Sequence, residues 1–339
     1  MSRCLELAVL AIGHVSPNPM VGAVLVHDGI IIGEGYHEQY GKAHAEVNCI
    51  NNVKEQDKHH IAGSTLYVSL EPCAHHGKTP PCADLIIVNN IERVVVGSHD
   101  PNTLVAGKGI MKLRDAGVEV IEHVLQRECD FLNRRFIAYH THQRPYIILK
   151  WAQSDDGFFA PDDDRQLWLS NEYSRKLSHR WRTEEDAILV GTKTALIDDP
   201  QLTARLWDGR NPVRILIDLD LKVPPESKIF DDEALTMVYN SVKEGLEYGT
   251  VYIKVTNDKT LPQQIASDLY RRHIQSVIIE GGAYTLTQFI VEGLWDEARI
   301  FTSPTMLVSG IKAPQIEGTQ HSEEKILDDT LTITLRSGL

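Results

Sequence analysis

The sequence predicts two successive α/β domains. Its length of 339 residues exceeds one typical domain of ~150 residues, so two hydrophobic cores are expected. Both halves alternate short β-branched runs with longer amphipathic segments, which is the pattern of an α/β fold. A polar stretch, HTHQR at residues 140–144, interrupts this alternation just before Pro145. We therefore expect one domain over residues 1–143 and a second over residues 144–339.

The first domain is predicted to be a sandwich of helices around a five-stranded sheet. Two apolar runs, residues 20–26 and 30–36, flank Asp28-Gly29, a dipeptide typical of a two-residue hairpin turn. A helix is expected over residues 43–51, with His44 and Glu46 in its first turn. Further strands are expected at residues 64–70, 93–97 and 118–121, and a second helix at the Pro80-Pro81 pair.

The second domain continues with a longer series of the same kind, beginning with a strand at residues 146–151. Later strands are expected at residues 187–191, 213–218, 236–239, 251–255, 276–280, 298–302 and 331–335. Helices are expected at residues 172–182, 261–273 and 283–291.

The composition, with 42% hydrophobic and 24% charged residues, is that of an ordinary globular protein. A net charge of −13 argues against a nucleic-acid partner. The N-terminal apolar stretch carries Glu6 and runs into Pro17-Asn18-Pro19, so it predicts an amphipathic helix rather than a signal peptide. No apolar run approaches the ~18 residues of a membrane span. We expect a cytoplasmic protein with no membrane partner.

A metal-ligand pattern lies within the first domain. His44 is followed by Glu46, then by Cys73 and Cys82. One imidazole and two thiolates form the three-ligand set of a catalytic zinc, which leaves a fourth position for water. Glu46 can reach that water without binding the metal and can carry its proton. The order matches the H-x-E and P-C-x-x-C signature of zinc nucleobase deaminases, except that eight residues, 74–81, separate the cysteines.

The insert between these cysteines, AHHGKTPP, is basic for so acidic a chain. His75, His76 and Lys78 beside a metal suit an anion, most simply a substrate phosphate, although a solvated loop is the alternative interpretation. Asn18 offers an amide that can read a base edge, and His37 lies seven residues before His44. The other cysteines are expected in the core.

Together these residues resemble the bifunctional deaminase–reductase family of riboflavin biosynthesis. The segments that carry the resemblance are SPNPMVGAVLV, GEGYHEQYGKAHAEV, YVSLEPCAHHGKTPPCADLI and DPNTLVAGKGI. The resemblance implies a cytidine-deaminase-like α/β/α sandwich with one zinc per chain, and Glu46 as its proton shuttle. It implies that the zinc ligands are His44, Cys73 and Cys82. It also implies substrate contacts from Asn18, His37, His75 and Lys78.

The second half resembles the reductase of the same family, which has a dihydrofolate-reductase-like α/β fold. The matching pieces are KWAQSDDG, Trp168, DAILVGTKTALIDDPQLTAR and IIEGG. The resemblance implies NADPH contacts from Ser154, Trp168, Thr194, Asp198, Gly281 and Gly282. It implies substrate contacts from Arg182, Leu202, Arg205 and Glu280. The glycine pair lets backbone amides approach a phosphate at the start of the next helix, whereas no Rossmann GxGxxG turn is present. Asp155, Phe158 and Gln166 depart from the family pattern.

The resemblance therefore implies two consecutive reactions. The first removes the 2-amino group of 2,5-diamino-6-(5-phosphoribosylamino)pyrimidin-4-one, and the second uses NADPH to reduce the ribosyl chain to ribityl phosphate. The expected partners are this phosphorylated pyrimidine and further copies of the chain in a homo-oligomer. Two alternatives stay open at this point. One is a nucleic-acid-editing deaminase with an appended module, and the other is a deaminase whose second domain is only a scaffold.

Overall fold

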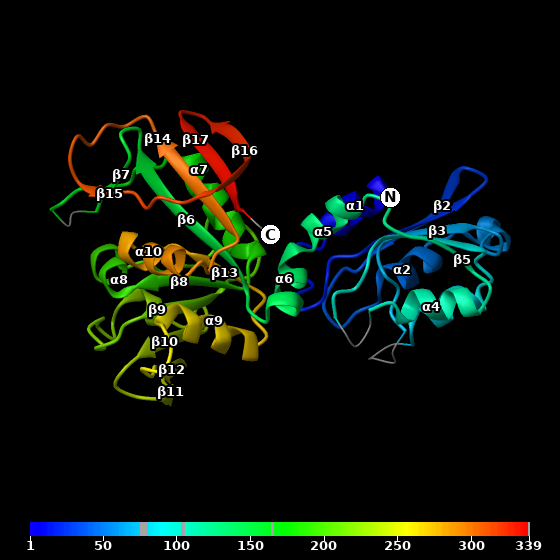
Figure 1. Cartoon of the computed structure of the whole chain (residues 1–339), viewed down its shortest axis with the longest axis horizontal. Helices are drawn as coiled ribbons and strands as arrows, with labels where there is room; N and C mark the ends of the chain where they lie inside the picture. Colours follow the sequence, from blue (N-terminus) through cyan, green and yellow to red (C-terminus); the bar gives the residue numbers. More distant parts are fainter. Residues whose placement is uncertain (75–79, 103–105, 164–165, 338–339) are drawn as a thin grey trace. The chain divides into compact units, whose positions relative to one another are not determined.

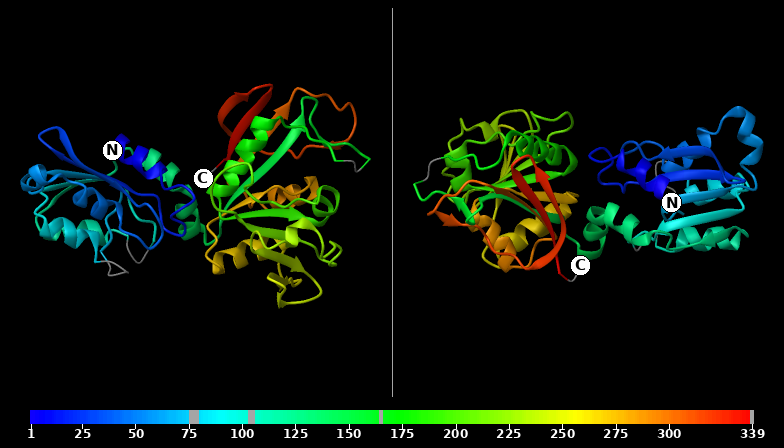
Figure 2. Two further views of the ribbon diagram at one scale, coloured as in Figure 1. Left: turned by 180° about the vertical axis from the view of Figure 1, so that it is seen from behind. Right: turned by 90° about the horizontal axis from the view of Figure 1, so that it is seen from above.

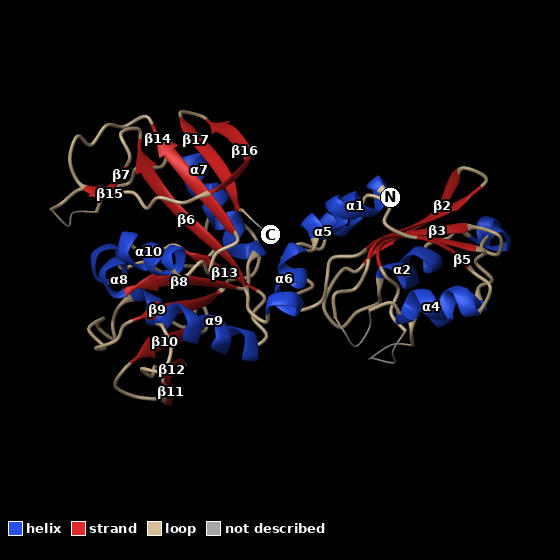
Figure 3. Cartoon of the chain, in the orientation of Figure 1, coloured by secondary structure: helices blue, strands red, loops and turns tan. Residues whose placement is uncertain are grey.

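A computed structural model describes residues 1–74, 80–102, 106–163 and 166–337 of the chain. The chain divides into two compact units, Met1–Gln143 and Arg144–Leu339 (Figure 1). Each unit mixes helices and strands (Figure 3). None of the helices in the described parts is long and apolar enough to cross a bilayer.

The first unit is built on a five-stranded sheet with the order β2-β1-β3-β4-β5. Its strands are β1 (Gly22–His27), β2 (Ile30–Tyr36), β3 (Thr65–Leu70), β4 (Arg93–Ser98) and β5 (Glu119–Ile121). The β1–β2 hairpin is antiparallel, and Asp28 and Gly29 take φ values of 46° and 76°, as its two-residue turn requires. Strands β3, β4 and β5 run parallel. The predicted sheet and hairpin are confirmed.

Helices cover both faces of this sheet (Figure 1, Figure 2). One face carries α1 (Ser2–Val9) and α5 (Gln126–Leu132), and the other carries α2 (Ala45–Asn51), α3 (Cys82–Val88) and α4 (Lys108–Asp115). A short 3-10 helix (Glu55–His60) follows α2, and α6 (Arg134–His142) closes the unit. The predicted three-layer sandwich is confirmed.

Helix α2 begins at Ala45, so His44 is its N-cap residue and not, as predicted, part of its first turn. The helix packs closely on β2 because Gly35 has no side chain. A Cβ atom at Gly35 would lie 2.3 Å from the backbone nitrogen of Cys49. This close approach holds the start of α2, and with it His44, against the sheet.

The second unit contains a ten-stranded sheet with the order β11-β12-β10-β9-β8-β13-β6-β14-β17-β16. The strands are β6 (Tyr146–Ser154), β8 (Ala187–Gly191), β9 (Val213–Ile217), β10 (Thr236–Asn240), β11 (Gly245–Glu247), β12 (Thr250–Lys254), β13 (Ser276–Ile279), β14 (Glu297–Ser303), β16 (Gly318–Ile326) and β17 (Asp329–Arg336). The seven neighbouring strands β12, β10, β9, β8, β13, β6 and β14 all run parallel to one another. Strands β7 (Phe158–Ala160) and β15 (Ile311–Lys312) form a separate small sheet.

All eight strands predicted for this unit are present, with ends that differ by a few residues. The helices are α7 (Glu172–Glu184), α8 (Thr192–Asp198), α9 (Leu261–Arg271) and α10 (Ala283–Val291), with a 3-10 turn at Lys228–Phe230. The sequence did not predict the short helix α8 or the short strands β7, β11 and β15. It also did not predict β16, whose sequence GTQHSEEKI has no apolar alternation. Strand β16 is exposed along most of its length and joins the sheet by backbone pairing with β17.

The two faces of β6 have different neighbours, as the two-residue period of a strand requires. Leu149 and its alternate neighbours belong to the main core, together with residues of α9 and α10. Lys150 points to the opposite face, where its ammonium lies 5.8 Å from the ring centroid of Phe301. Trp181 of α7 stacks on the same ring at 5.5 Å. A half-buried lysine therefore lies under α7, on the face away from the main core.

Candidate active sites

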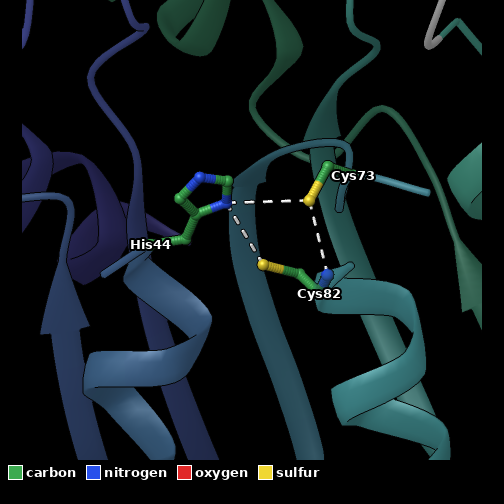
Figure 4. A group of neighbouring side chains, drawn as sticks. All are labelled: His44, Cys73 and Cys82. Atoms are coloured by element: carbon green, nitrogen blue, oxygen red, sulfur yellow. Dashed lines mark hydrogen bonds between the residues drawn. The ribbon is translucent and has the colours of Figure 1, made fainter. Parts of the chain in front are cut away.

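Three potential metal ligands converge in the first unit (Figure 4). His44 Nδ1 lies 3.6 Å from Cys73 Sγ and 3.3 Å from Cys82 Sγ, and the three atoms all lie within 4.8 Å of one another. A tetrahedral zinc with bonds of about 2.3 Å to sulfur and about 2.0 Å to nitrogen would separate such atoms by about 3.5 Å. The N/S₂ donor set and its spacing therefore fit a zinc ion.

Each ligand is held by the end of a different element. His44 caps α2, Cys73 follows β3 after Glu71 and Pro72, and Cys82 opens α3. The backbone N–H of Cys82 donates to Cys73 Sγ at 3.3 Å. The pKa of Cys73 is lowered by the Cys82 thiol and by His44, although burial opposes this shift. Cys73 is thus prepared to bind a cation as a thiolate.

Glu46 lies on the first turn of α2, beside this cluster, and its side chain is buried. Burial raises the pKa of Glu46, and the charge of Cys73 raises it further. A carboxyl group that holds a proton more readily than usual, next to a metal site, suits a residue that takes up and releases a proton.

Asn18 and His37 meet next to His44. His37 Nδ1 lies 2.9 Å from the carbonyl oxygen of Ala43, which can only accept, so Nδ1 carries the hydrogen. Nε2 of the neutral ring therefore accepts from Asn18 Nδ2 at 3.0 Å. Burial lowers the pKa of His37, which favours this neutral form. The His37 ring lies 5.5 Å from the His44 ring.

The insert residues His75 and Lys78 lie outside the described residues, so their contacts stay predictions. A second group of metal-ligand types in the first unit is His99, Glu122 and His123. Both Glu122 oxygens there are engaged, one with Arg114 and the other with His99 Nε2 at 2.6 Å. This second group is an ion-pair network near the surface. The positive charge of the Arg114 guanidinium disfavours binding of a metal cation there.

In the second unit, adjacent strands β8 and β13 both end at the start of a helix, α8 and α10 respectively. Gly282 is the N-cap residue of α10, and a Cβ atom there would lie 3.4 Å from Thr194 Oγ1 of α8. Thr194 and the Gly281-Gly282 turn are thus brought together, at the strand ends where α/β sheets bind ligands. The free N–H groups at the start of α10 suit a phosphate.

The other three residues predicted to contact the cofactor are Ser154, Trp168 and Asp198. Burial raises the pKa of Asp198, the last residue of α8, while a hydrogen bond with Gln166 opposes the shift. Gln166 thereby holds the loop before α7 against α8. Trp168 follows in that loop and is 60% exposed. Ser154 Oγ is occupied within its own turn, where it donates to Asp156 at 2.6 Å and accepts from the Phe158 N–H at 2.9 Å.

Two of the four predicted substrate residues, Arg182 and Glu280, form an ion pair with little exposure to solvent. Arg182 of α7 donates to Glu280 Oε2 at 2.9 Å and to the Thr203 carbonyl oxygen at 3.0 Å. Burial alone would raise the pKa of Glu280, but the charges of Arg182 and Lys150 outweigh it and lower the pKa to about 2. Leu202 is buried with a φ of 59°, and Arg205 follows it at the exposed edge.

Sequence comparison matches both units to known families. The RibD C-terminal domain profile matches residues 145–334, and the cytidine and deoxycytidylate deaminase zinc-binding region profile matches residues 1–98. The riboflavin biosynthesis protein RibD of Aquifex aeolicus (strain VF5) is 42% identical to the chain, and the match covers 96% of the chain and 92% of that protein. The chain belongs to the RibD family.

Solved structures agree with this RibD assignment. A Thermotoga maritima protein described as a diaminohydroxyphosphoribosylaminopyrimidine deaminase/5-amino-6-(5-phosphoribosylamino)uracil reductase is 36% identical. It superposes with a TM-score of 0.90, covering 99% of this chain and 97% of its own. Acinetobacter baumannii RibD, form 1, is 30% identical with a TM-score of 0.89, covering 98% and 97%.

The chain is therefore a bifunctional deaminase and reductase of riboflavin biosynthesis, with a zinc-dependent deaminase domain and a reductase domain that uses a nicotinamide cofactor. Both predicted folds, cytidine-deaminase-like and dihydrofolate-reductase-like, are confirmed. The RibD assignment decides against a nucleic-acid-editing deaminase and against a second domain that is only a scaffold.

The sequence did not predict a role for three residues that lie at the two candidate sites. Lys150 Nζ lies 3.9 Å from Glu280 Oε1 within the reductase network. His179 is buried on α7, one turn before Arg182. Glu71 is buried beside Cys73 and accepts from the backbone N–H groups of Gly107 and Gly109, both at 3.0 Å. A charged residue within an apolar strand, such as Lys150 in YIILKW, was the available signal.

Proposed function

We propose that the first domain deaminates 2,5-diamino-6-(5-phosphoribosylamino)pyrimidin-4-one and that the second domain reduces the ribosyl chain of the product with NADPH. The observation that carries the first step is the convergence of His44, Cys73 and Cys82 beside the buried carboxyl group of Glu46. The products are ammonia and the phosphorylated pyrimidine that the second domain receives.

We assign one zinc ion per chain to the three-ligand group. When bound, zinc supplies the Lewis acidity that makes a water molecule nucleophilic at neutral pH. His44, Cys73 and Cys82 are the residues that would hold the ion. Two thiolates would offset the charge of the zinc ion and so reduce the acidity of its water. A nearby residue that accepts the water's proton is therefore needed.

Glu46 is that residue in our proposal. It accepts a proton from the attacking water and passes it to the departing amine. The water oxygen bonds to ring carbon 2, the bond to the 2-amino nitrogen breaks, and ammonia leaves. The burial of Glu46 beside the three candidate ligands supports this role.

Asn18 and His37 orient the pyrimidine. Because Asn18 Nδ2 donates to His37, its Oδ1 atom is directed elsewhere and can accept from an amino group of the substrate. We assign His75 and Lys78 to the substrate phosphate on the basis of the sequence. Lys78→Ala is expected to weaken binding of the phosphorylated substrate more than binding of its dephosphorylated form.

NADPH supplies a hydride to the second reaction, and the protein positions it. We place the cofactor against Ser154, Trp168, Thr194, Asp198, Gly281 and Gly282. We place the substrate against Arg182, Leu202, Arg205 and Glu280. The proximity of Gly282 to Thr194, and the electrostatic coupling among Arg182, Arg205 and Glu280, support these two groupings.

The deciding experiment follows NADPH oxidation by the full chain supplied with the deaminated pyrimidine, with NADH in a parallel assay. We expect oxidation of NADPH in preference to NADH. Absence of oxidation with both cofactors would refute the reductase assignment. Metal analysis tests for one zinc per chain. We also propose a cytoplasmic homo-oligomer, which light scattering after size-exclusion chromatography tests.

A further inference from the structure

One buried side chain holds the backbone beside Asn18 from a distant part of the chain. Asn133 lies between α5 and α6 and is only 2% exposed. Its Oδ1 atom accepts from the Met20 N–H at 2.9 Å, and its Nδ2 atom donates to the Met20 carbonyl oxygen, also at 2.9 Å. Asn133 and Met20 are 113 positions apart in the sequence. A single amide thus pairs with both backbone polar groups of one residue, as an antiparallel strand would.

The segment held in this way, residues 20–22, leads into β1 and has further partners. The Val21 carbonyl oxygen accepts from the His37 N–H at 2.9 Å. The Gly22 N–H donates to Ser69 Oγ of β3 at 3.1 Å, and the backbone ladder between β1 and β3 begins only with the next residue. Three separate parts of the chain therefore fix this segment, and the amide between α5 and α6 holds its first residue.

The loop that precedes this segment carries Asn18, one of the two residues that we assign to orient the pyrimidine. Asn18 Nδ2 lies 3.0 Å from His37 Nε2. Only Pro19 separates Asn18 from Met20. Proline fixes its own φ angle and restricts the residue before it, so little backbone freedom remains between the two. A shift of Met20 should therefore move the Asn18 side chain away from His37.

We propose that Asn133 is a positioning residue for the deamination and acts on the substrate through Asn18. This inference rests on the proposed function and deepens it. By fixing Met20, Asn133 keeps the Asn18 amide bonded to His37, so that Asn18 Oδ1 stays directed at the pyrimidine. Asn133 makes no contact with the substrate itself, because its side chain is buried and both ends of its amide are engaged by Met20.

The test is a double-mutant cycle in the full chain, with Asn133→Ala, Asn18→Ala and the two together. Ammonia release from 2,5-diamino-6-(5-phosphoribosylamino)pyrimidin-4-one gives kcat/KM, and zinc content is measured on the same samples. Ser64→Ala, alone and with Asn18→Ala, is the matched control. Ser64 is buried in the same domain and donates to the His60 carbonyl oxygen, at the opposite end of β3 from Cys73.

We expect Asn133→Ala to lower kcat/KM roughly tenfold, the upper value for loss of one hydrogen bond between neutral groups. Zinc should stay bound, because none of the three candidate ligands is displaced. In the Asn18→Ala background, Asn133→Ala should lower kcat/KM by less than about twofold, since the residue through which it acts is already absent. Any effect of Ser64→Ala should be the same in both backgrounds.

An equal loss from Asn133→Ala in both backgrounds would overturn the proposal, because a purely structural effect multiplies with the loss of Asn18. Loss of zinc from Asn133→Ala would overturn it as well. If Asn133→Ala does not fold, Asn133→Asp takes its place in the cycle. This variant leaves no cavity and still accepts from the Met20 N–H, but its carboxylate cannot donate to the Met20 carbonyl oxygen.

Failure of the proposed function is a separate result, since the wild type would then release no ammonia from this pyrimidine. A wild-type kcat/KM in Asn18→Ala would overturn the inference together with the assignment of Asn18 to the substrate. A loss in Asn18→Ala that multiplies with the loss in Asn133→Ala would overturn the inference alone.

Discussion

The deaminase centre draws its ligands from one short stretch of sequence, whereas the reductase centre joins residues far apart in the chain. His44, Cys73 and Cys82 lie within 39 consecutive positions and converge on one point. Arg182 and Glu280 are 98 positions apart and meet at the end of β13. We expect the first centre to be held together by a metal ion that its side chains bind, whereas the second is held together by opposite charges.

This difference determines how each centre should fail. Without the metal, the deaminase domain should lose its activity. Its fold should suffer less, because His44, Cys73 and Cys82 can share protons and need not stay charged. Without its carboxylate, the reductase network keeps buried cations that have no counter-charge, which costs folding free energy. Substitutions in one centre should spare the other, because the two lie in separate compact units.

The largest effect is expected from Cys82→Ser. The variant loses one of two thiolate ligands, so we expect zinc to be lost and deamination to fall to background. NADPH oxidation with deaminated substrate should be unchanged, and it provides the internal control. Metal content and ammonia release measure the loss. Full deamination by a zinc-free variant would contradict the metal assignment.

Glu46→Gln should reduce deamination by roughly 10²- to 10⁴-fold, the usual contribution of a positioned acid–base group. Zinc should stay bound, because Glu46 is not among the three ligands. Ammonia release and metal content are measured together. The control is Glu55→Gln, which alters an exposed carboxylate paired with Lys58. A variant that loses zinc and activity together would show that Glu46 supports the metal and not the proton transfer.

Glu280→Gln should abolish reduction and destabilise the reductase domain by about 3–5 kcal/mol, because Arg182 and Lys150 lose their counter-charge. The five tryptophans of the chain, Trp151, Trp168, Trp181, Trp207 and Trp295, all lie in this domain, so tryptophan fluorescence follows its unfolding selectively. Glu247→Gln, which breaks an exposed pair with Lys243, should cost less than about 1 kcal/mol.

The same variant predicts a pH dependence. The pKa of Glu280 is lowered from 4.5 to about 2 in the folded protein, mainly by Arg182 and Lys150 against the effect of burial. The ionised Glu280 side chain therefore contributes its full stabilisation of the folded domain above pH 4.5. This contribution is lost as the pH falls from 4.5 towards 2. Over that window, the wild type should lose more stability than Glu280→Gln. Parallel losses in both proteins would contradict the ionised state of Glu280.

The smallest effect is expected from Glu71→Gln. The neutral amide accepts more weakly from the N–H groups of Gly107 and Gly109, so the deaminase domain should lose about 1–3 kcal/mol and bind zinc less tightly. Zinc release during denaturation measures this change, and tryptophan fluorescence should not move. Glu119→Gln, which removes an exposed partner of Arg93, is the control in the same domain. An equal effect of both substitutions would remove the supporting role of Glu71.

The sequence was most informative where a chemical requirement is local. The hairpin at Asp28-Gly29 and the positions of His44 and Cys73 follow from short patterns of residue type. It was least informative where backbone pairing or distant contacts decide the structure. Strand β16 is polar and exposed, so nothing in its sequence distinguishes it from a loop. His179 is an ordinary helical residue until α7 is packed against the strand ends.

The sequence by itself therefore determined the type of fold, the set of three candidate zinc ligands, and the order of the two domains. These features depend on residue type and spacing, which can be read directly from the sequence. Only the tertiary structure decided that His44 caps α2, that Glu71 anchors the turn beside Cys73, and that Lys150 and His179 face the Arg182–Glu280 pair. These contacts depend on which strands become neighbours, and strand order is set by the burial of whole faces and not by any short segment.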